Sequence, residues 1–248
     1  MVEHLEELRV RLFRIIGLLL VGIIVGFFLS MPVYRYLEDI VKDNVAPGVP
    51  YKPIFTGLTG PFMLQIKMAF YIGLFLTLPF TVHQLWGFVA PGLRTNERKP
   101  FKIVAPVSTL LFFMGAGACW FILPVTVTWL TAFAQQFPET EMMLEAGSMV
   151  FLLIKMILSF GIGFQMPIIV FVLARLEVVT PAAMMKYWRH AVVFVVIASA
   201  VITPSGDPLS LAVLSLPLIG LFFLSVWAAR VTLRKQKREA GEELDDLD

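Results

Sequence analysis

Acidic and basic side chains alternate with helical spacing near the start of this chain. Residues 3–12 read Glu-His-Leu-Glu-Glu-Leu-Arg-Val-Arg-Leu, and the three leucines share one helix face. Glu7 and Arg11 are four residues apart, a spacing that allows an ion pair on a helix surface. One interpretation is an amphipathic surface helix whose charges satisfy one another. The other is that the carboxylates receive an incoming basic group.

A second candidate carboxylate, Glu97, lies in a segment where it is the only acid among four bases. A surface ion pair with Arg94 or Arg98 is one interpretation, and such a pair contributes well under ~1 kcal/mol. The alternative is that Glu97 acts together with Glu6 and Glu7, which requires all three to lie at one face of the molecule.

Long apolar stretches are the elements that must position these groups. The chain has 248 residues, of which 58% are hydrophobic and 15% charged, a composition far from that of soluble domains. A membrane span needs about 20 apolar residues. The sequence predicts an all-α, polytopic membrane domain over residues 1–229, with six transmembrane helices at about 12–29, 68–90, 103–125, 149–174, 188–203 and 209–229.

The predicted fifth span is short, because Arg189 and His190 stand at its start and a Pro-Ser-Gly-Asp-Pro segment ends it. A short span thins the bilayer locally or is shielded by neighbouring helices, and both alternatives remain open. Prolines within the spans predict kinked helices. Residues 31–66 are expected to form a long external loop with a short helix at 34–41.

The positive charges indicate the orientation of the spans. Of 20 Lys and Arg residues, 15 lie near the N-terminus, in the second and fourth connections and in the tail. Because loops rich in Lys and Arg stay in the cytoplasm, both termini are expected there. The tail, 230–248, turns from basic to acidic and is expected to be disordered. Lys67 and Lys155, near the external ends of two spans, are expected to snorkel outward.

Several classes of function are disfavoured by the composition. The bases flank membrane ends and form no single stripe, so no nucleic-acid partner is expected. Cys119 is the only cysteine, which excludes an intramolecular disulfide. The methionines have no accompanying cluster of His or Cys, so neither a metal site nor a cofactor is expected.

Three motifs in order resemble the TatC family, the multi-spanning core of the twin-arginine (Sec-independent) protein translocase. They are His4-Leu5-x-Glu7-Leu8-Arg9, then Phe88-x-x-Pro91-x-Leu93-x-x-x-Glu97-Arg98, then Phe160-Gly161-x-x-Phe164-x-x-Pro167. The resemblance covers essentially the whole chain. It implies a concave bundle that binds signal peptides with adjacent arginines and helps export folded proteins by using the proton gradient.

The resemblance implies particular site residues. Glu7 and Glu97 match the positions of signal-peptide acceptors, and Glu6 is a third candidate at a position that the motif leaves open. A guanidinium presents a rigid fork of donors to a carboxylate, which Lys cannot imitate. The resemblance further implies that the loop beside these carboxylates is shaped by Phe88, Pro91 and Leu93 and held through charge pairing by Arg9 and Arg98.

The chain departs from the family pattern in the fourth span, where a Glu is usual and this sequence has Gln165. Polar side chains within a membrane are candidates for function, and interhelical hydrogen bonding is the structural alternative. Any step that needs a proton on this position is therefore in doubt. Asp207 matches an acidic position of the last external loop, where it either contacts a partner helix or caps the sixth span.

The implied partners are signal peptides of folded cargo, single-span subunits of the TatA and TatB type on the fourth to sixth spans, and further copies of this chain. The implied location is a bacterial or archaeal cytoplasmic (inner) membrane. Two other classes of function compete with this interpretation. A secondary transporter of small solutes or ions would show repeated halves and polar groups at the midplane. An intramembrane protease would need histidine motifs that this chain lacks, so no enzyme activity is expected.

Overall fold

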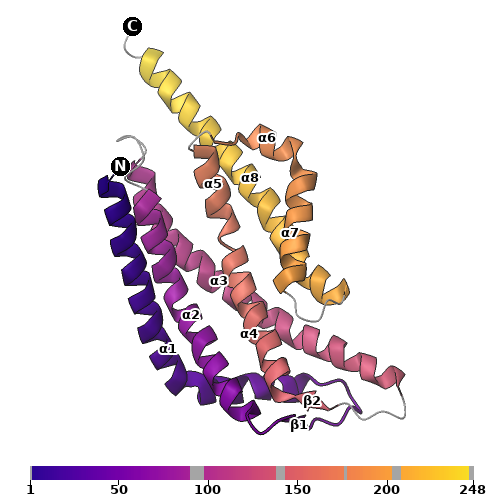
Figure 1. Ribbon diagram of the computed structural model, residues 1–248. Coiled ribbons are helices and arrows are strands. Elements are labelled where there is room, and N and C mark those ends of the chain that lie inside the picture. Colours follow the sequence, from indigo (N-terminus) through magenta and orange to yellow (C-terminus); the bar gives the residue numbers. More distant parts are fainter. Residues whose placement is uncertain (1, 90–97, 138–142, 176–177, 203–207, 246–248) are drawn as a thin grey trace. The chain divides into compact units, whose positions relative to one another are not determined.

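The computed structural model describes residues 2–89, 98–137, 143–175, 178–202 and 208–245. Its elements are α1 (Val2–Asn44), β1 (Pro53–Ile54), α2 (Gly60–Val89), α3 (Arg98–Ala132), the 3-10 helix η3 (Phe133–Gln136), β2 (Leu144–Glu145), α4 (Ala146–Gly163), α5 (Met166–Arg175), α6 (Pro181–Lys186), α7 (Trp188–Ile202) and α8 (Pro208–Asp245) (Figure 1). The chain divides into two compact units, Met1–Gly161 and Ile162–Asp248.

The predicted all-α membrane class is confirmed. Within the described residues, five stretches are long and apolar enough to cross a membrane: Glu6–Asn44, Gly60–Leu85, Pro106–Gln136, Ala146–Ala174 and Leu211–Thr232. A sixth apolar helix, Trp188–Val201, is shorter. The six apolar segments predicted from the sequence fall on these helices. The shorter helix, Trp188–Val201, corresponds to the predicted short fifth span at 188–203.

In the first unit, α1 and α2 run side by side (Figure 1) because small residues let their backbones approach. A Cβ atom added at Gly73 would lie 2.6 Å from the backbone nitrogen of Ile23. One added at Gly22 would lie 2.6 Å from Cγ2 of Thr77. Only glycine fits at these two positions, so the seam fixes how α1 lies against α2.

The segment after the first apolar stretch differs from the expectation of a loop from residue 31. Instead α1 continues through Pro32 to Asn44, because one proline removes one backbone hydrogen bond and can bend a helix without ending it. The end of α1 is tied to the end of α3. The Ala46 amide donates to Oγ1 of Thr131 (2.9 Å), and the Tyr36 ring stacks on that of Trp120, with centroids 4.8 Å apart.

A short parallel pairing, which the sequence did not predict, joins the segments that precede α2 and α4. Pro53 lies opposite Leu144, and Ile54 lies opposite Glu145. Because β1 precedes α2 and β2 precedes α4, the pairing brings the starts of these two helices to the same end of the unit.

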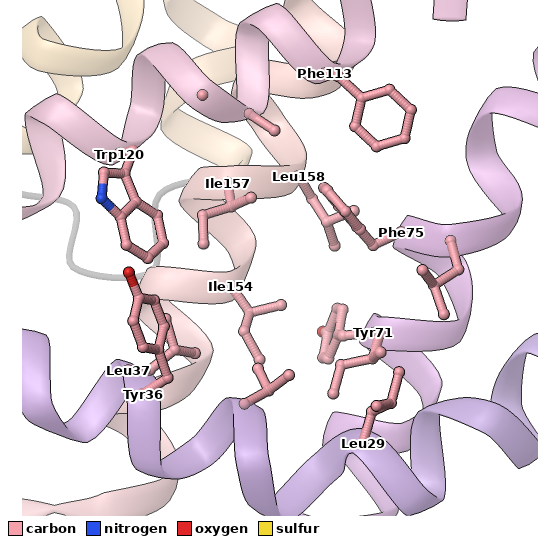
Figure 2. A pocket seen from close by; sticks show the side chains of 15 residues that line it. Leu29, Tyr36, Leu37, Tyr71, Phe75, Phe113, Trp120, Ile154, Ile157 and Leu158 are labelled. Carbon is pink, nitrogen blue, oxygen red and sulfur yellow. The ribbon is translucent and has the colours of Figure 1, made fainter.

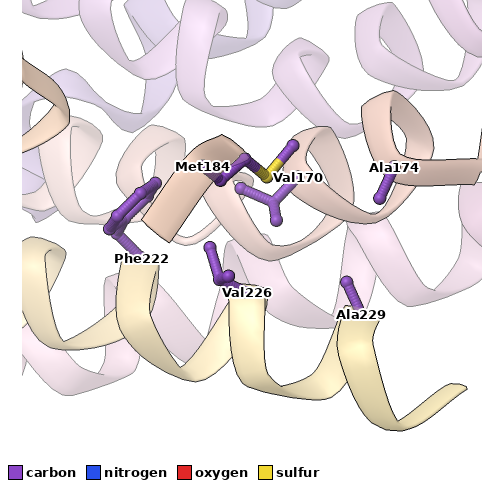
Figure 3. Close-up of a cluster of buried hydrophobic side chains, with 6 residues drawn as sticks. All are labelled: Val170, Ala174, Met184, Phe222, Val226 and Ala229. Atoms are coloured by element: carbon purple, nitrogen blue, oxygen red, sulfur yellow. The ribbon is translucent and has the colours of Figure 1, made fainter. Parts of the chain in front are cut away.

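The second unit is built around a small hydrophobic cluster. Figure 3 shows Val170 and Ala174 of α5, Met184 of α6, and Phe222, Val226 and Ala229 of α8, which are all buried. The α6 helix begins where the Thr180 side chain accepts a hydrogen bond from the Ala183 amide, 3.2 Å long. Burial of this apolar face holds α5 and α6 on α8.

The tail differs from the expectation of disorder beyond residue 229, since α8 remains helical to Asp245.

Candidate functional site

Near the start of α1, Glu7 forms an ion pair with Arg11. Nη2 of Arg11 lies 2.6 Å from Oε1 of Glu7, and Nε donates to the same oxygen at 3.2 Å. The side chain of Glu7 is 31% exposed and that of Arg11 is 20% exposed. The i,i+4 interpretation of these charges is therefore correct, and the paired carboxylate still faces solvent.

Arg11 also connects α1 to the end of α2. Its Nη1 atom donates to the backbone carbonyl of Gln84, 3.0 Å away. A Cβ atom at Gly87 would overlap the same nitrogen, so the missing side chain leaves room for the guanidinium. Arg11 thus holds Glu7 beside the last turns of α2, from which the segment with Glu97 departs.

Arg11 is the residue that the sequence-based site omitted, although its spacing from Glu7 pointed to it. Arg9, which the resemblance implied as a charge partner of the loop, lies with its guanidinium 5.7 Å from the centroid of the Phe13 ring. Glu6 and Arg9 are both exposed.

The structure describes only some of the other residues predicted to bind the signal peptide. Pro91, Leu93 and Glu97 lie outside the described residues. Phe88 belongs to the last turn of α2, and Arg98 is the first residue of α3. Glu97 therefore immediately precedes α3 in the chain.

Gln165 stands where the fourth apolar segment is interrupted. Helix α4 ends at Gly163 and α5 begins at Met166, while the Gln165 carbonyl accepts from the amides of Ile168 (3.0 Å) and Ile169 (3.1 Å). Its residue surface is only 7% exposed. The boundary between the two compact units follows Gly161, near the end of α4, so Gln165 lies four residues beyond it in the chain. Asp207, the other predicted polar contact, lies outside the described residues.

An apolar cavity of about 490 Å³ lies within the first unit. Figure 2 shows its walls, which come from α1 (Leu29, Tyr36, Leu37), α2 (Tyr71, Phe75), α3 (Phe113, Trp120) and α4 (Ile154, Ile157, Leu158). Its size lies within the usual range of ligand pockets, about 300–1,000 Å³. The sequence did not predict the cavity, because four separate helices supply its walls.

The described residues contain no group of three or more His, Cys, Asp or Glu side chains that could hold a metal ion. The chemistry that the described site offers is thus a solvent-facing carboxylate positioned by an arginine, together with an apolar cavity on the same helices.

Comparison with known proteins shows similarity over nearly the full length. A family model described as "Sec-independent protein translocase protein (TatC)" matches residues 3–217. The protein of that name from Magnetococcus marinus is 34% identical, with 98% of this chain and 89% of the relative covered. TatCy of Bacillus subtilis is 32% identical, with 99% and 94% covered.

A solved structure is similar as well. The "Crystal Structure of Twin Arginine Translocase Receptor- TatC" superposes with a TM-score of 0.81 at 28% sequence identity. The match covers 92% of this chain and 98% of that one. The likeness therefore includes both compact units.

Proposed function

Because this chain belongs to the TatC family of Sec-independent protein translocase proteins, we propose that Glu7 and Glu97 receive the paired arginines of signal peptides. The chain is a receptor and core component of the twin-arginine translocase, a protein-transport system. The finer assignment to these two carboxylates rests on their positions in the motifs and on the geometry around Glu7.

The observation that carries this proposal is the position of Glu7, which is exposed to solvent and fixed against α2 through Arg11. Nε and Nη2 of Arg11 both donate to Oε1 of Glu7, which fixes the carboxylate at the position where the proposal places the first arginine of the signal peptide. Two adjacent arginines need two separated carboxylates, and Glu97 supplies the second in this proposal.

The apolar part of the signal peptide would pack in the cavity between α1, α2, α3 and α4 in this proposal. Glu7 and the cavity lie on the same α1 helix, so a peptide docked at Glu7 has an apolar route along it. Removal of apolar peptide surface from water stabilises such a complex by about 25 cal/mol per Å². Glu6 would add negative charge nearby, and Arg9, Phe88, Pro91, Leu93 and Arg98 would shape the docking face.

We further propose that the docking face is cytoplasmic and that both termini lie on that side, in a bacterial or archaeal cytoplasmic membrane. The distribution of Lys and Arg supports this orientation. Single-span TatA- and TatB-type subunits would contact the fourth to sixth spans. In support, Val193, Ile197 and Val201 form an exposed apolar stripe along α7 at a four-residue spacing.

Binding of signal peptides to the purified full chain in lipid nanodiscs tests the docking site. A peptide with Arg-Arg should bind more tightly than one with Lys-Lys. Each of Glu7→Gln and Glu97→Gln should weaken Arg-Arg binding roughly 10- to 100-fold, as expected for a lost hydrogen bond between charged groups. Asp39→Asn, at an exposed acid near the other end of α1, is the matched control and should change nothing.

Two results would count against the site: unchanged binding by both Glu variants, or equal affinity for the two peptides. Gly117→Leu tests the role of the cavity. A Cβ atom at Gly117 meets open space, so the leucine side chain would fill part of the cavity. It should weaken binding of the full signal peptide and leave a peptide without the apolar segment unaffected.

A further inference from the structure

Two lysines on different helices lie inside membrane spans at a similar depth. Lys67 is seven residues beyond the start of α2 and Lys155 is nine beyond the start of α4. At 1.5 Å per residue these positions are about 10 and 14 Å along their helices. Because the pairing of β1 with β2 brings the two helix starts to one end, both ammonium groups belong to the same side of the membrane.

Both lysines line a single cavity of about 390 Å³. Its other walls are Ile66, Phe70 and Tyr71 of α2 and Phe151 of α4. Nζ of Lys67 lies 5.2 Å from the centroid of the Phe151 ring. The lining thus contains two cations and aromatic faces but no acid.

The charges around this cavity do not balance. The acid nearest to the two lysines in the chain is Glu145, in β2. Hydrogen bonds from Ser148 lower the pKa of the Glu145 carboxyl, and the positive charge of Lys67 lowers it further. Within the described ranges, neither lysine has a carboxylate at ion-pair distance. Two like charges that line one cavity repel each other, so a bound anion between them would stabilise the arrangement.

The surroundings of the cavity indicate what carries the anion. Ile66 and Phe70 are each 43% exposed and lie on the outward surface of α2, where a membrane protein contacts lipid chains. A ligand that fits here combines one negative charge with long apolar chains. Snorkelling alone would bring each lysine to water separately and would not explain why both line one cavity.

We propose that this cavity binds an anionic phospholipid of the leaflet adjoining β1 and β2. Its phosphate lies between the ammonium groups of Lys67 and Lys155, and its acyl chains lie along Ile66 and Phe70. The inference does not depend on the signal-peptide site, whose residues lie near the other end of α1 and α2.

Native mass spectrometry of the purified full chain tests the site by titration with phosphatidylglycerol and, separately, with phosphatidylcholine. Phosphatidylglycerol should bind more tightly. Lys67→Gln combined with Lys155→Gln should weaken its binding roughly 30-fold, because each lysine near a membrane surface contributes about fivefold. Lys42→Gln combined with Lys52→Gln, two exposed external lysines, is the matched control and should bind as the parent does.

Lys67→Arg combined with Lys155→Arg keeps both charges and should retain the preference, which separates loss of charge from disturbed folding. Equal binding of the two lipids, or unchanged binding by the double Gln variant, would overturn the proposal. Displacement of phosphatidylglycerol by millimolar inorganic phosphate would also overturn it, because the cavity would then be a site for free phosphate and not for a lipid.

Discussion

At the scale of single residues, the arrangement around Glu7 shows how one arginine can do two tasks. Arg11 neutralises part of the carboxylate through Nε and Nη2 and fixes its position through Nη1 on the Gln84 carbonyl. A planar guanidinium can make these contacts together because its donors point in different directions. Arg11 is therefore a positioning residue for Glu7.

Arg11→Lys is expected to weaken binding of the Arg-Arg signal peptide about fivefold, because a single ammonium cannot hold Glu7 and Gln84 with the same geometry. Gly87→Ala should act in the same direction, since the added methyl displaces the guanidinium. The dissociation constant measured by fluorescence anisotropy checks both. Arg14→Lys, at an exposed arginine one turn further along, is the control; an equal loss in that variant would show a general effect of charge.

At the scale of elements, close contacts between helices determine how α1 and α2 pack, and breaks in the helical backbone determine where each helix ends. The small residues of the α1–α2 seam bring two backbones together where lipid supplies no hydrophobic driving force. Pro32 is accommodated within α1, whereas the fourth apolar segment divides into α4 and α5 at Phe164-Gln165. Pro167 follows that break and cannot donate a backbone hydrogen bond across it.

Gly73→Ala is expected to destabilise the protein by roughly 1–3 kcal/mol, because the new methyl group meets the backbone of Gly22 and Ile23, which cannot rotate away. Gly17→Ala, in the partner helix α1, has open space around it and should be neutral or slightly stabilising. Thermal unfolding in detergent, followed by circular dichroism, measures both. Equal unfolding temperatures for the two variants would show that the seam is not tightly packed.

At the scale of the whole molecule, the charge distribution along the chain predicts its orientation. The bases of the tail and of the second and fourth connections are expected on one side of the membrane, and the segments that carry β1 and β2 are expected on the other. The only native thiol, Cys119, is fully buried, which makes the chain suitable for labelling at introduced cysteines.

Lys52→Cys should react with a membrane-impermeant maleimide in intact cells, because the segment before β1 is expected outside. Lys237→Cys in the tail should react only after the membrane is permeabilised. The parent chain, with Cys119 alone, gives the background. Reaction of both introduced cysteines in intact cells would contradict the proposal that both termini are cytoplasmic.

The sequence by itself determined the membrane class, the six apolar helices, the shortness of the fifth and the family. These properties follow from local composition and from motif order, because hydrophobic length and residue spacing act along the chain. The spacing of Glu7 and Arg11 likewise predicted their ion pair. The loop predicted from residue 31 was wrong, because a single proline such as Pro32 is compatible with a continuing helix. The tail was expected to be disordered, whereas α8 is helical to Asp245.

Only the tertiary structure decided which distant residues meet. Arg11 contacts Gln84 across 73 positions of sequence, β1 pairs with β2, and four helices enclose one apolar cavity. Lys67 and Lys155, which look like separate snorkelling residues in sequence, line one cavity for the same reason. Such contacts depend on the relative rotation and depth of packed helices, and small steric details such as the missing side chain of Gly73 set both.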